Sequence, residues 1–265
     1  MSFRKRVEKK LHEKEKAYEI EQLMKEKRSE EYEVLEEVFD KSTLMVIYDL
    51  MNEDVIDEIY GVVKAGKESR VYWGKNKSKE ELAIKIYLTI AAEFRKGMLK
   101  YIEGDPRFKG VKHGTRSLVY AWAQKEYRNL HQATAAKVKV PKPIAVKKNV
   151  LVMEFIGEDG VSAPCMKEQP PKNPEEAYNT LLGYLEQFYR KAGLIHGDLS
   201  EYNVMIWKGR LVLFDVSQAV PPSHPLADSL LRRDLQNLNS FFSRLGVKVL
   251  PVEESYRKVT GHDGS

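Results

Sequence analysis

A short polar stretch decides how this chain folds and what chemistry it can carry: His196-Gly197-Asp198-Leu199-Ser200-Glu201-Tyr202-Asn203. Asp198 offers a carboxylate that can accept a proton from an attacking hydroxyl, whereas Asn203 offers a neutral oxygen to a metal ion. Twelve positions after Asn203, Asp215 adds a carboxylate for the same or a second metal ion. Two apolar runs, 204–207 and 211–214, predict a β-hairpin that joins the two metal-binding positions.

This spacing is typical of phosphoryl transfer from a nucleotide. Protein kinases carry H-R-D-x-x-x-x-N in their catalytic loop, and a second Asp follows a short hairpin. By that comparison Asp198 is the predicted catalytic base, and Asn203 and Asp215 are predicted metal ligands. The alternative is a chance polar spacing in a loop, because short motifs often occur at random. The hairpin and the placement of Asp215 argue against chance, and the chain is expected to bind ATP.

The composition is that of a globular protein without a membrane span. Hydrophobic residues make up 42% of the chain and charged residues 31%, which argues against a disordered chain. No apolar run approaches the roughly eighteen residues that cross a bilayer, and no hydrophobic signal region follows the charged start. Cys165 is the single cysteine, so no internal disulfide is possible and a cytoplasmic location is expected. The net charge of +5 permits an anionic partner without requiring one.

Three segments are expected along the chain. Residues 1–41 are densely charged with a loose apolar periodicity, which predicts a solvated helical segment. Residues 42–156 are predicted to form a β-rich lobe and residues 157–265 a mainly helical lobe, so the expected fold class is two-lobed α+β. The predicted strands are 59–64, 69–75, 82–88, 143–146 and 150–155. The predicted helices are 44–51, capped by Ser42-Thr43, and 117–136, 173–191, 225–245 and 252–259.

Lys85 is the only charge in an apolar strand that runs from Leu82 to Leu88. Burying its stem costs free energy unless an anion meets the ammonium group. Protein kinases have a V-A-I-K strand whose lysine contacts the α- and β-phosphates and a helix glutamate. Glu126 is the candidate for that glutamate in this chain. In the alternative, Lys85 lies at a strand edge and extends its amine to water.

The expected nucleotide-binding loop is less regular. When Val71 is aligned with the valine of G-x-G-x-x-G-x-V, one of the three glycine positions keeps its glycine, but backbone amides and a serine hydroxyl can still donate to phosphate. A Walker A loop starting at Gly61 fails, because Glu68 stands where Ser or Thr should bind Mg²⁺ and because a strand follows instead of a helix. The predicted loop residues are Lys64, Gly66, Lys67, Ser69 and Val71.

Together these motifs resemble the RIO family of atypical protein kinases, and most closely its first subgroup. The subgroup with an N-terminal winged helix matches poorly, because residues 1–40 lack that domain's apolar content. The short chain resembles an archaeal member. The resemblance extends over roughly residues 42–260 and rests on the stretches 64–72, 82–87, 121–126, 196–203 and 215–218.

The resemblance implies a trimmed kinase fold that binds ATP with Mg²⁺, or with Mn²⁺ in its place, and that phosphorylates its own serine. It implies that Asp215 transiently accepts a phosphoryl group. It also implies a role in maturing the small ribosomal subunit, with rRNA and ribosomal proteins as partners of a monomeric enzyme. From their position after the last strand of the first lobe, the C=O of Glu154 and the N–H of Ile156 are expected to pair with adenine, with Met153 at the rear of the pocket.

Other functions use the same residue types. Aminoglycoside and choline kinases share H-G-D-x-x-x-x-N, but they need a helical acceptor lobe, for which the fifty residues after Asp215 are too few. A pseudokinase scaffold would have no physical need for Lys85, Glu126, Asp198, Asn203 and Asp215 together. ATP hydrolysis that controls release from an RNA–protein particle fits every residue, so the sequence leaves kinase and ATPase activity both open.

The connection between Lys85 and Glu126 spans forty-one positions and is predicted to be a long basic flap. It would carry Thr115 or Ser117 as a phosphorylation site and give salt-sensitive affinity for structured RNA. A mobile solvated loop is the alternative. The flap is defined by the cations Arg95, Lys96, Lys100, Arg107, Lys109, Lys112, His113 and Arg116.

Overall fold

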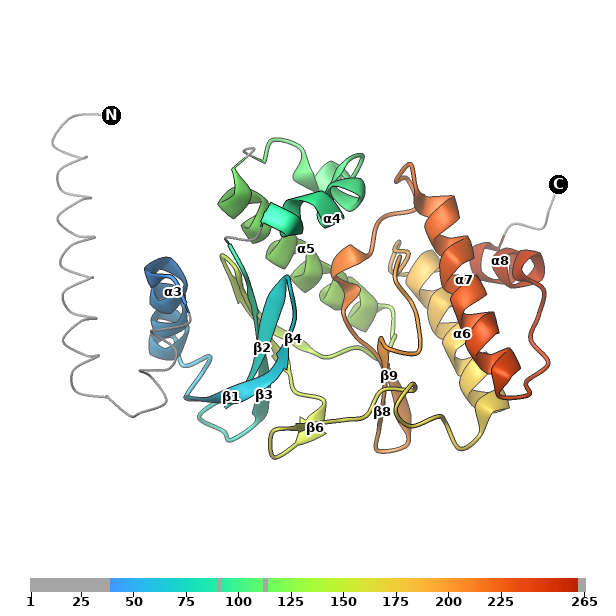
Figure 1. Ribbon diagram of the computed structural model, residues 1–265, viewed down its shortest axis with the longest axis horizontal. Coiled ribbons are helices and arrows are strands. Elements are labelled where there is room, and N and C mark those ends of the chain that lie inside the picture. The colour runs from blue at the N-terminus through green and yellow to red at the C-terminus, as the bar shows by residue number, and fades with distance from the viewer. Residues whose placement is uncertain (1–38, 90–91, 112–113, 262–265) are drawn as a thin grey trace, which may run out of the picture.

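The computed structural model describes residues 39–89, 92–111 and 114–261, and the predicted segment 1–41 lies almost entirely outside them. Figure 1 shows a β-sheet lobe and a mainly helical lobe, in agreement with the predicted α+β class. Within the described residues no helix is both long and apolar enough to span a membrane. The helices are α3 (Lys41–Asn52), α4 (Ala92–Ile102), α5 (Thr115–Ala135), α6 (Pro174–Arg190), α7 (Ala227–Arg244) and α8 (Val252–Thr260).

All five predicted strands of the first lobe are present, and they form one antiparallel sheet of order β1-β2-β3-β5-β4. β3 lies at the centre, where Lys85 is in register with Val71 on β2 and Leu151 on β5. The strand bounds are β1 Glu58–Ala65, β2 Ser69–Lys75, β3 Glu81–Tyr87, β4 Pro143–Lys147 and β5 Val150–Glu154.

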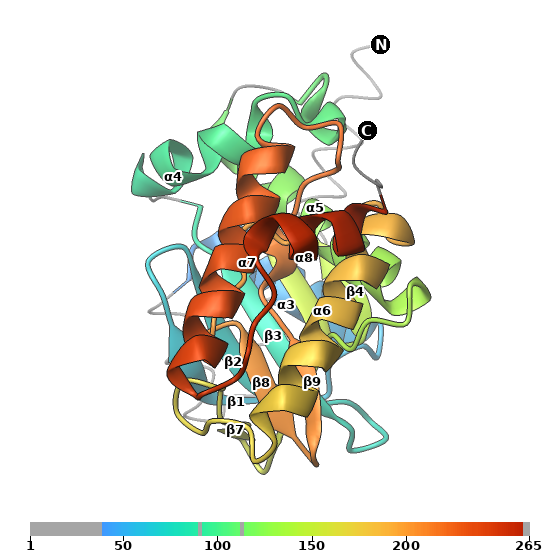
Figure 2. The same cartoon turned by 90° about the vertical axis from the view of Figure 1, so that its right-hand side faces the viewer.

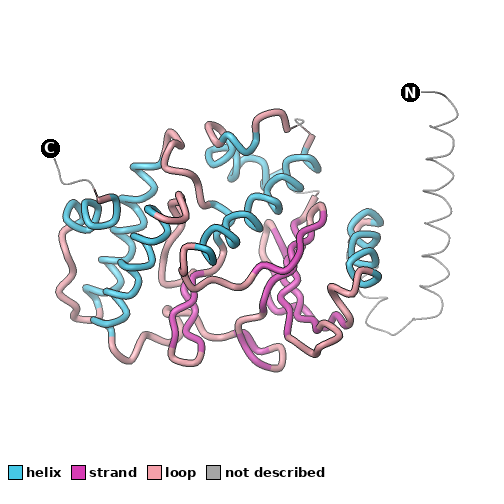
Figure 3. Tube along the Cα trace, turned by 180° about the vertical axis from the view of Figure 1, so that it is seen from behind, coloured by secondary structure: helices cyan, strands magenta, loops and turns pink. Residues whose placement is uncertain are grey.

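The alternation of side chains along β3 decides where Lys85 points. Successive residues of a strand face opposite sides of the sheet. Ile84 and Ile86 therefore pack into the core under α3, together with Val46 and Leu50 of that helix. Lys85 faces the other side, where α5 and the second lobe lie. Figure 3 shows the strands between α3 and the long α5.

The N-terminal cap of α3 differs from the prediction. The helix begins at Lys41 because the Asp40 carboxylate, rather than Ser42 or Thr43, accepts the backbone N–H of Thr43, at 3.0 Å. An aspartate is a strong N-cap residue, and one carboxylate three residues before an unpaired backbone N–H is sufficient to start the helix.

The connection between Lys85 and Glu126 was expected to be a long loop before the helix at 117. It is largely helical, so that part of the prediction was wrong. It contains α4 and a 3₁₀ turn, η1 (Pro106–Phe108). Three apolar residues, Met98, Tyr101 and Phe108, are buried, and the two aromatic rings pack against Trp122 of α5. In the sequence these three apolar residues are separated by lysines and arginines. The helical spacing of apolar residues is therefore not apparent from the sequence. The cations Arg95, Lys96, Lys112 and His113 have no described side chain.

The second lobe packs α6, α7 and α8 together, as Figure 2 shows. Asn173 caps α6 as predicted, since its side chain accepts the N–H of Glu176. The expected hairpin is formed by β8 (Val204–Trp207) and β9 (Arg210–Leu213), and the two residues of its turn, Lys208 and Gly209, both have positive φ. A small unpredicted hairpin, β6 (Gly157–Glu158) and β7 (Val161–Ser162), precedes α6.

Candidate active site

A buried aspartate on α7 holds the catalytic loop. Asp234 accepts hydrogen bonds from the backbone N–H groups of Gly197, at 2.7 Å, and Leu199, at 2.8 Å, so it clamps both sides of Asp198. Gly197 has a φ of +77°, which favours glycine. Burial raises the pKa of Asp234 to about 7, although both hydrogen bonds oppose that shift. Arg233 adds a hydrogen bond to the Gly197 carbonyl.

Asp198 and Asn203 lie side by side, as their spacing predicts. The amide nitrogen of Asn203 donates to the Asp198 backbone carbonyl at 2.8 Å and to its carboxylate at 3.3 Å. The amide oxygen of Asn203 is thereby left for a cation. Burial and the charge of Asp215 raise the pKa of Asp198, which makes its carboxylate a better proton acceptor.

Lys85 joins the two lobes through two carboxylates. Its Nζ lies 2.9 Å from Oε1 of Glu126 on α5 and 2.9 Å from Oδ1 of Asp215. The side chain is 8% exposed, so the alternative of a strand-edge lysine in water is wrong. Burial opposes the charge, but Asp215 and Glu126 hold the pKa of Lys85 well above its usual value. Tyr87 donates a further hydrogen bond to Glu126.

Asp215 has a left-handed backbone conformation, with φ of 57° and ψ of 56°. Such a conformation is uncommon for a residue other than glycine and is often found at functional sites. Oδ1 accepts from both Lys85 and the Ser217 hydroxyl, the latter at 3.0 Å, so Oδ2 points to no described donor. Burial alone would raise the pKa of Asp215, but the charge and hydrogen bond of Lys85 lower it to about 2.

The segment after Asp215, η2 (Val216–Gln218), is held from α5. Lys125 donates to the Ser217 carbonyl at 2.9 Å, and Asn129 donates to the Val216 carbonyl at 2.7 Å. Arg107 binds the Ala219 carbonyl and forms an ion pair with buried Asp105. Arg107 is therefore a structural residue, and its earlier placement among the free flap charges was wrong. Lys125 and Asn129 are four residues apart on one helix. This spacing is the one feature of the sequence that indicates that both side chains reach the same segment.

Replacing Asn129 with Ala is expected to loosen η2. The change removes the Asn129 donor from the buried Val216 carbonyl, which keeps the Ala219 N–H, and it also removes the Asn129 acceptor of Arg107. Each lost hydrogen bond contributes about 0.5–1.5 kcal/mol, and the segment that follows Asp215 is held less firmly. We expect a lower unfolding temperature and weaker Mg²⁺-dependent nucleotide binding, measured by thermal unfolding and calorimetry. Gln132→Ala, at an exposed position of the same helix, is the control. An equal loss in both variants would contradict the role of Asn129 in holding η2.

A hollow between the sheet and Asp215 contains most of the predicted nucleotide-binding residues. Its volume is about 270 Å³. Glu126 lies behind it, paired with Lys85. Glu68 and Phe214 were not predicted, although each is adjacent to a predicted residue; burial and the charge of Asp215 raise the pKa of Glu68. The lining residues are Lys64, Gly66, Lys67, Glu68, Ser69, Val71, Lys85, Met153, Phe214 and Asp215.

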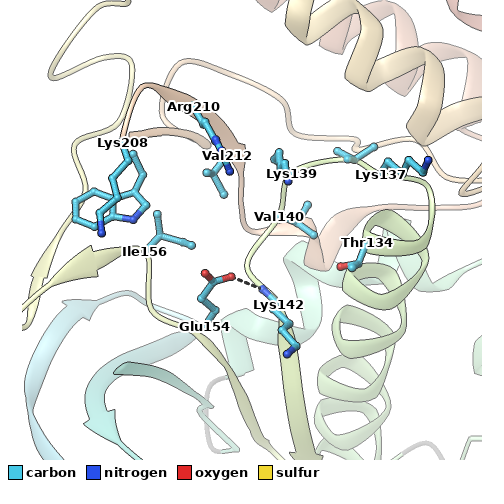
Figure 4. Close-up of a pocket in the computed structure, with 12 residues that line it drawn as sticks. Thr134, Lys137, Lys139, Val140, Lys142, Glu154, Ile156, Lys208, Arg210 and Val212 are labelled. Carbon is cyan, nitrogen blue, oxygen red and sulfur yellow. Dashed lines mark hydrogen bonds between the residues drawn. The ribbon is translucent and has the colours of Figure 1, made fainter. Parts of the chain in front are cut away.

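The predicted adenine-binding residues divide between two hollows. Met153 lines the nucleotide hollow, whereas Glu154 and Ile156 line a second hollow, shown in Figure 4, that shares no lining residue with the first. The backbone contacts predicted for Glu154 and Ile156 with adenine stay a prediction.

The residues present suit a magnesium ion that also binds phosphate. Within the described ranges no group of three or more His, Cys, Asp or Glu side chains could enclose a metal on its own. Mg²⁺ is commonly held by one or two carboxylates together with substrate phosphates. Asp215, which lines the nucleotide hollow, and the Asn203 amide oxygen are the groups that would hold such an ion.

Comparisons with known proteins identify the family. A model of the RIO domain matches residues 70–255. RIO-type serine/threonine-protein kinase Rio1 of Haloferax volcanii is 42% identical over 241 residues, which cover 91% of this chain and 82% of the relative. Its namesake from Methanocaldococcus jannaschii is 37% identical over 250 residues, with 94% and 85% covered.

A solved structure supports the fold. The Rio2 kinase of Chaetomium thermophilum, in an ADP/Mg²⁺-phosphoaspartate complex, matches with a TM-score of 0.61 at 20% identity, covering 83% of this chain and 66% of that one. With the extensive similarity to the archaeal Rio1 kinases, this chain belongs to the RIO family of serine/threonine-protein kinases.

Proposed function

We propose that the site transfers the γ-phosphoryl group of ATP to a serine or threonine hydroxyl, with Asp198 as the base and Asp215 and Asn203 as ligands of Mg²⁺ or Mn²⁺. The observation that carries the proposal is the position of Lys85, whose ammonium group lies between Glu126 and Asp215 at the wall of the nucleotide hollow. Autophosphorylation at Thr115 or Ser117, in the first turn of α5, is part of this proposal.

Each residue has a distinct task in this mechanism. Lys85 orients the α- and β-phosphates, and Glu126 fixes the direction of its amine. Asp198 accepts the proton of the attacking hydroxyl, and Asp234 holds the loop that presents Asp198. When bound, the metal ion neutralises the charge that develops on the transferred group. In phosphoryl transfer such positioning and charge stabilisation supply most of the catalysis.

A second activity, ATP hydrolysis through a phosphorylated Asp215, is favoured by one contact pattern. Lys85 and Ser217 both bind Oδ1, which leaves Oδ2 to attack the γ-phosphorus. The bond between that phosphorus and the β–γ bridging oxygen breaks, ADP leaves, and water later hydrolyses the acyl phosphate. The related Rio2 kinase was crystallised as a phosphoaspartate complex.

We also propose that the enzyme acts as a cytoplasmic monomer on the small ribosomal subunit, with rRNA and ribosomal proteins as partners. The support is the similarity to Rio1 kinases and the net charge of +5.

Replacing Asp215 with Asn tests the metal site. The substitution keeps the shape but removes the charge, so Mg²⁺-dependent nucleotide binding should weaken by at least about 10–100-fold, the loss seen when even outer-shell partners of a metal are removed. Calorimetry with and without Mg²⁺ measures this, while radiolabelled phosphate transfer and phosphate release are assayed in parallel. Glu175→Gln, at an exposed carboxylate on α6, is the control. Absence of Mg²⁺-dependent nucleotide binding in the wild-type protein would refute the proposed function.

A further inference from the structure

A basic hollow lies beside the segment that joins the lobes and shares no lining residue with the nucleotide hollow. It has a volume of about 830 Å³ and is not used by the proposed reaction. As Figure 4 shows, its cations come from separate stretches of chain that surround one space. The floor is apolar, with Val140, Ile156 and Val212 buried. The cations are Lys137, Lys139 and Lys142, before β4, and Lys208 and Arg210, at the β8–β9 turn.

A second hollow continues this surface across the β8–β9 turn. Its volume is about 560 Å³, and Lys208 and Arg210 line both hollows. It adds Lys172 and one carboxylate, Glu176, so the two hollows together carry six cations and two carboxylates, counting Glu154 of the first hollow. Each hollow also has an aromatic side chain in its lining, Trp207 in the first and Tyr184 in the second. We call this surface the posterior groove.

The positive charges of the posterior groove are not neutralised from within the protein. None of its six cations forms an ion pair with any residue that the structure describes, and Lys137, Lys139, Lys142, Lys208 and Arg210 are exposed. Glu154 is the one carboxylate in the first hollow, and it accepts the backbone N–H of Lys142 at 3.1 Å. Like charges gathered at one surface repel each other, and a bound polyanion relieves that repulsion.

We propose that the posterior groove binds a single strand of RNA. Charges spread over two hollows match a chain of repeating phosphates, whereas a single phosphate would need them to converge. Trp207 and Tyr184 are half-buried aromatic side chains of the lining, and the Lys208 ammonium lies 4.9 Å from the centroid of the Trp207 ring. Stacking of bases on such rings is the usual way in which single strands are bound. The Thr134 hydroxyl, which donates to the Leu130 carbonyl, and the Glu154 carboxylate can accept a hydrogen bond from ribose 2′-hydroxyls, which DNA lacks.

The groove is separate from the site of phosphoryl transfer. Met153 faces the nucleotide hollow and the neighbouring Glu154 faces the groove, so both can be occupied together. RNA bound there would leave Lys85, Asp198 and Asp215 uncovered. The groove would thus hold the enzyme on an RNA-containing particle while the catalytic loop acts elsewhere.

The test is fluorescence anisotropy of a labelled single-stranded oligoribonucleotide with the full-length protein over a series of salt concentrations. We compare the wild type with the triple variant Lys139→Gln/Lys208→Gln/Arg210→Gln. Each lost phosphate contact should reduce the slope of log K against log salt by about 0.7 for a single strand, so the triple variant should lose about 2. Mg²⁺-ATP binding should be unchanged, which also verifies that the variant folds.

The matched control removes three exposed lysines far from the groove in sequence, Lys41→Gln/Lys248→Gln/Lys258→Gln. It should keep the wild-type slope, and an equal loss in both variants would overturn the proposal. Trp207→Leu should weaken binding by about tenfold or more, the loss of one stacked base, and Trp207→Phe should restore it. Equal affinity for DNA of the same sequence, or displacement of RNA by an acidic peptide of equal charge, would overturn the assignment to RNA.

Discussion

Replacing Asp198 with Ala is expected to lower the rate of phosphoryl transfer by about 10²–10⁴-fold, the range that a general base contributes. Nucleotide affinity should change little, because Asp198 does not line the nucleotide hollow. The structure also predicts that the loop survives the change. Its backbone is held by Asp234 and by Asn237, which donates to the Leu199 carbonyl at 3.0 Å.

The measurement is initial-rate transfer of labelled phosphate, with nucleotide affinity determined by calorimetry. Glu201→Gln is the control, because this carboxylate lies in the same loop and pairs with Arg244, which is 61% exposed. Glu201 itself is 13% exposed, but it does not line the nucleotide hollow, and Gln keeps its size and can still bond Arg244, so the control should retain nearly full activity. Near wild-type transfer by the Asp198→Ala variant would show that another group takes the proton.

Replacing Lys85 with Met is expected to have the second large effect, because it acts on both stability and activity. Glu126 is 1% exposed, and removing Lys85 leaves this buried carboxylate with the Tyr87 hydrogen bond but without a counter-charge, at a cost of about 3–5 kcal/mol. The orientation of the phosphates is lost as well. We therefore expect a large fall in unfolding temperature and loss of phosphoryl transfer.

The pH dependence of this loss has a definite sign. Burial raises the pKa of Glu126 in the wild type although Lys85 opposes it, and without Lys85 the pKa must rise further. The folded variant then holds a proton that the unfolded chain releases, so its stability falls as pH increases from the unfolded pKa towards the raised folded value. The variant should be closest to the wild type in stability at low pH.

A double variant separates the two effects. In Lys85→Met/Glu126→Gln no unpaired charge is buried at α5, so most of the stability should return while activity stays absent. Thermal unfolding between pH 5 and pH 8 measures the first and phosphate transfer the second. A double variant no more stable than Lys85→Met would mean that the pair is not coupled as the 2.9 Å contact indicates.

Much of the fold and the site could be predicted, because the chemistry fixes residue types at short spacing. Asp198 and Asn203 lie in one loop, and the hairpin that delivers Asp215 shows two apolar runs around Lys208 and Gly209. The strand pattern around Lys85 is equally local. These features depend on residues that are close together in the sequence, so they can be recognised without the tertiary structure.

The flap was the main error, and its cause is physical. Met98, Tyr101 and Phe108 are buried in one cluster with Trp122 of α5. This packing between distant residues stabilises the helical form of the segment. The charges of that segment were also misjudged, because Arg107 is neutralised by Asp105 and the Ala219 carbonyl, which lies 112 positions away. The partner carboxylate lies only two positions before Arg107, but the local sequence does not show that Arg107 also reaches Asn129 and the Ala219 carbonyl across the fold.

The sequence by itself determined the catalytic loop, the order of the strands along the chain and the identity of the buried lysine, since each follows from local spacing and polarity. Only the tertiary structure decided that Asp234 holds the catalytic loop, that Lys125 and Asn129 fix the segment after Asp215, and that the posterior groove exists. These depend on side chains from distant elements meeting in space. Packing of α5 and α7 against the loops creates those contacts, and the free energy of burying one partner depends on where the other lies.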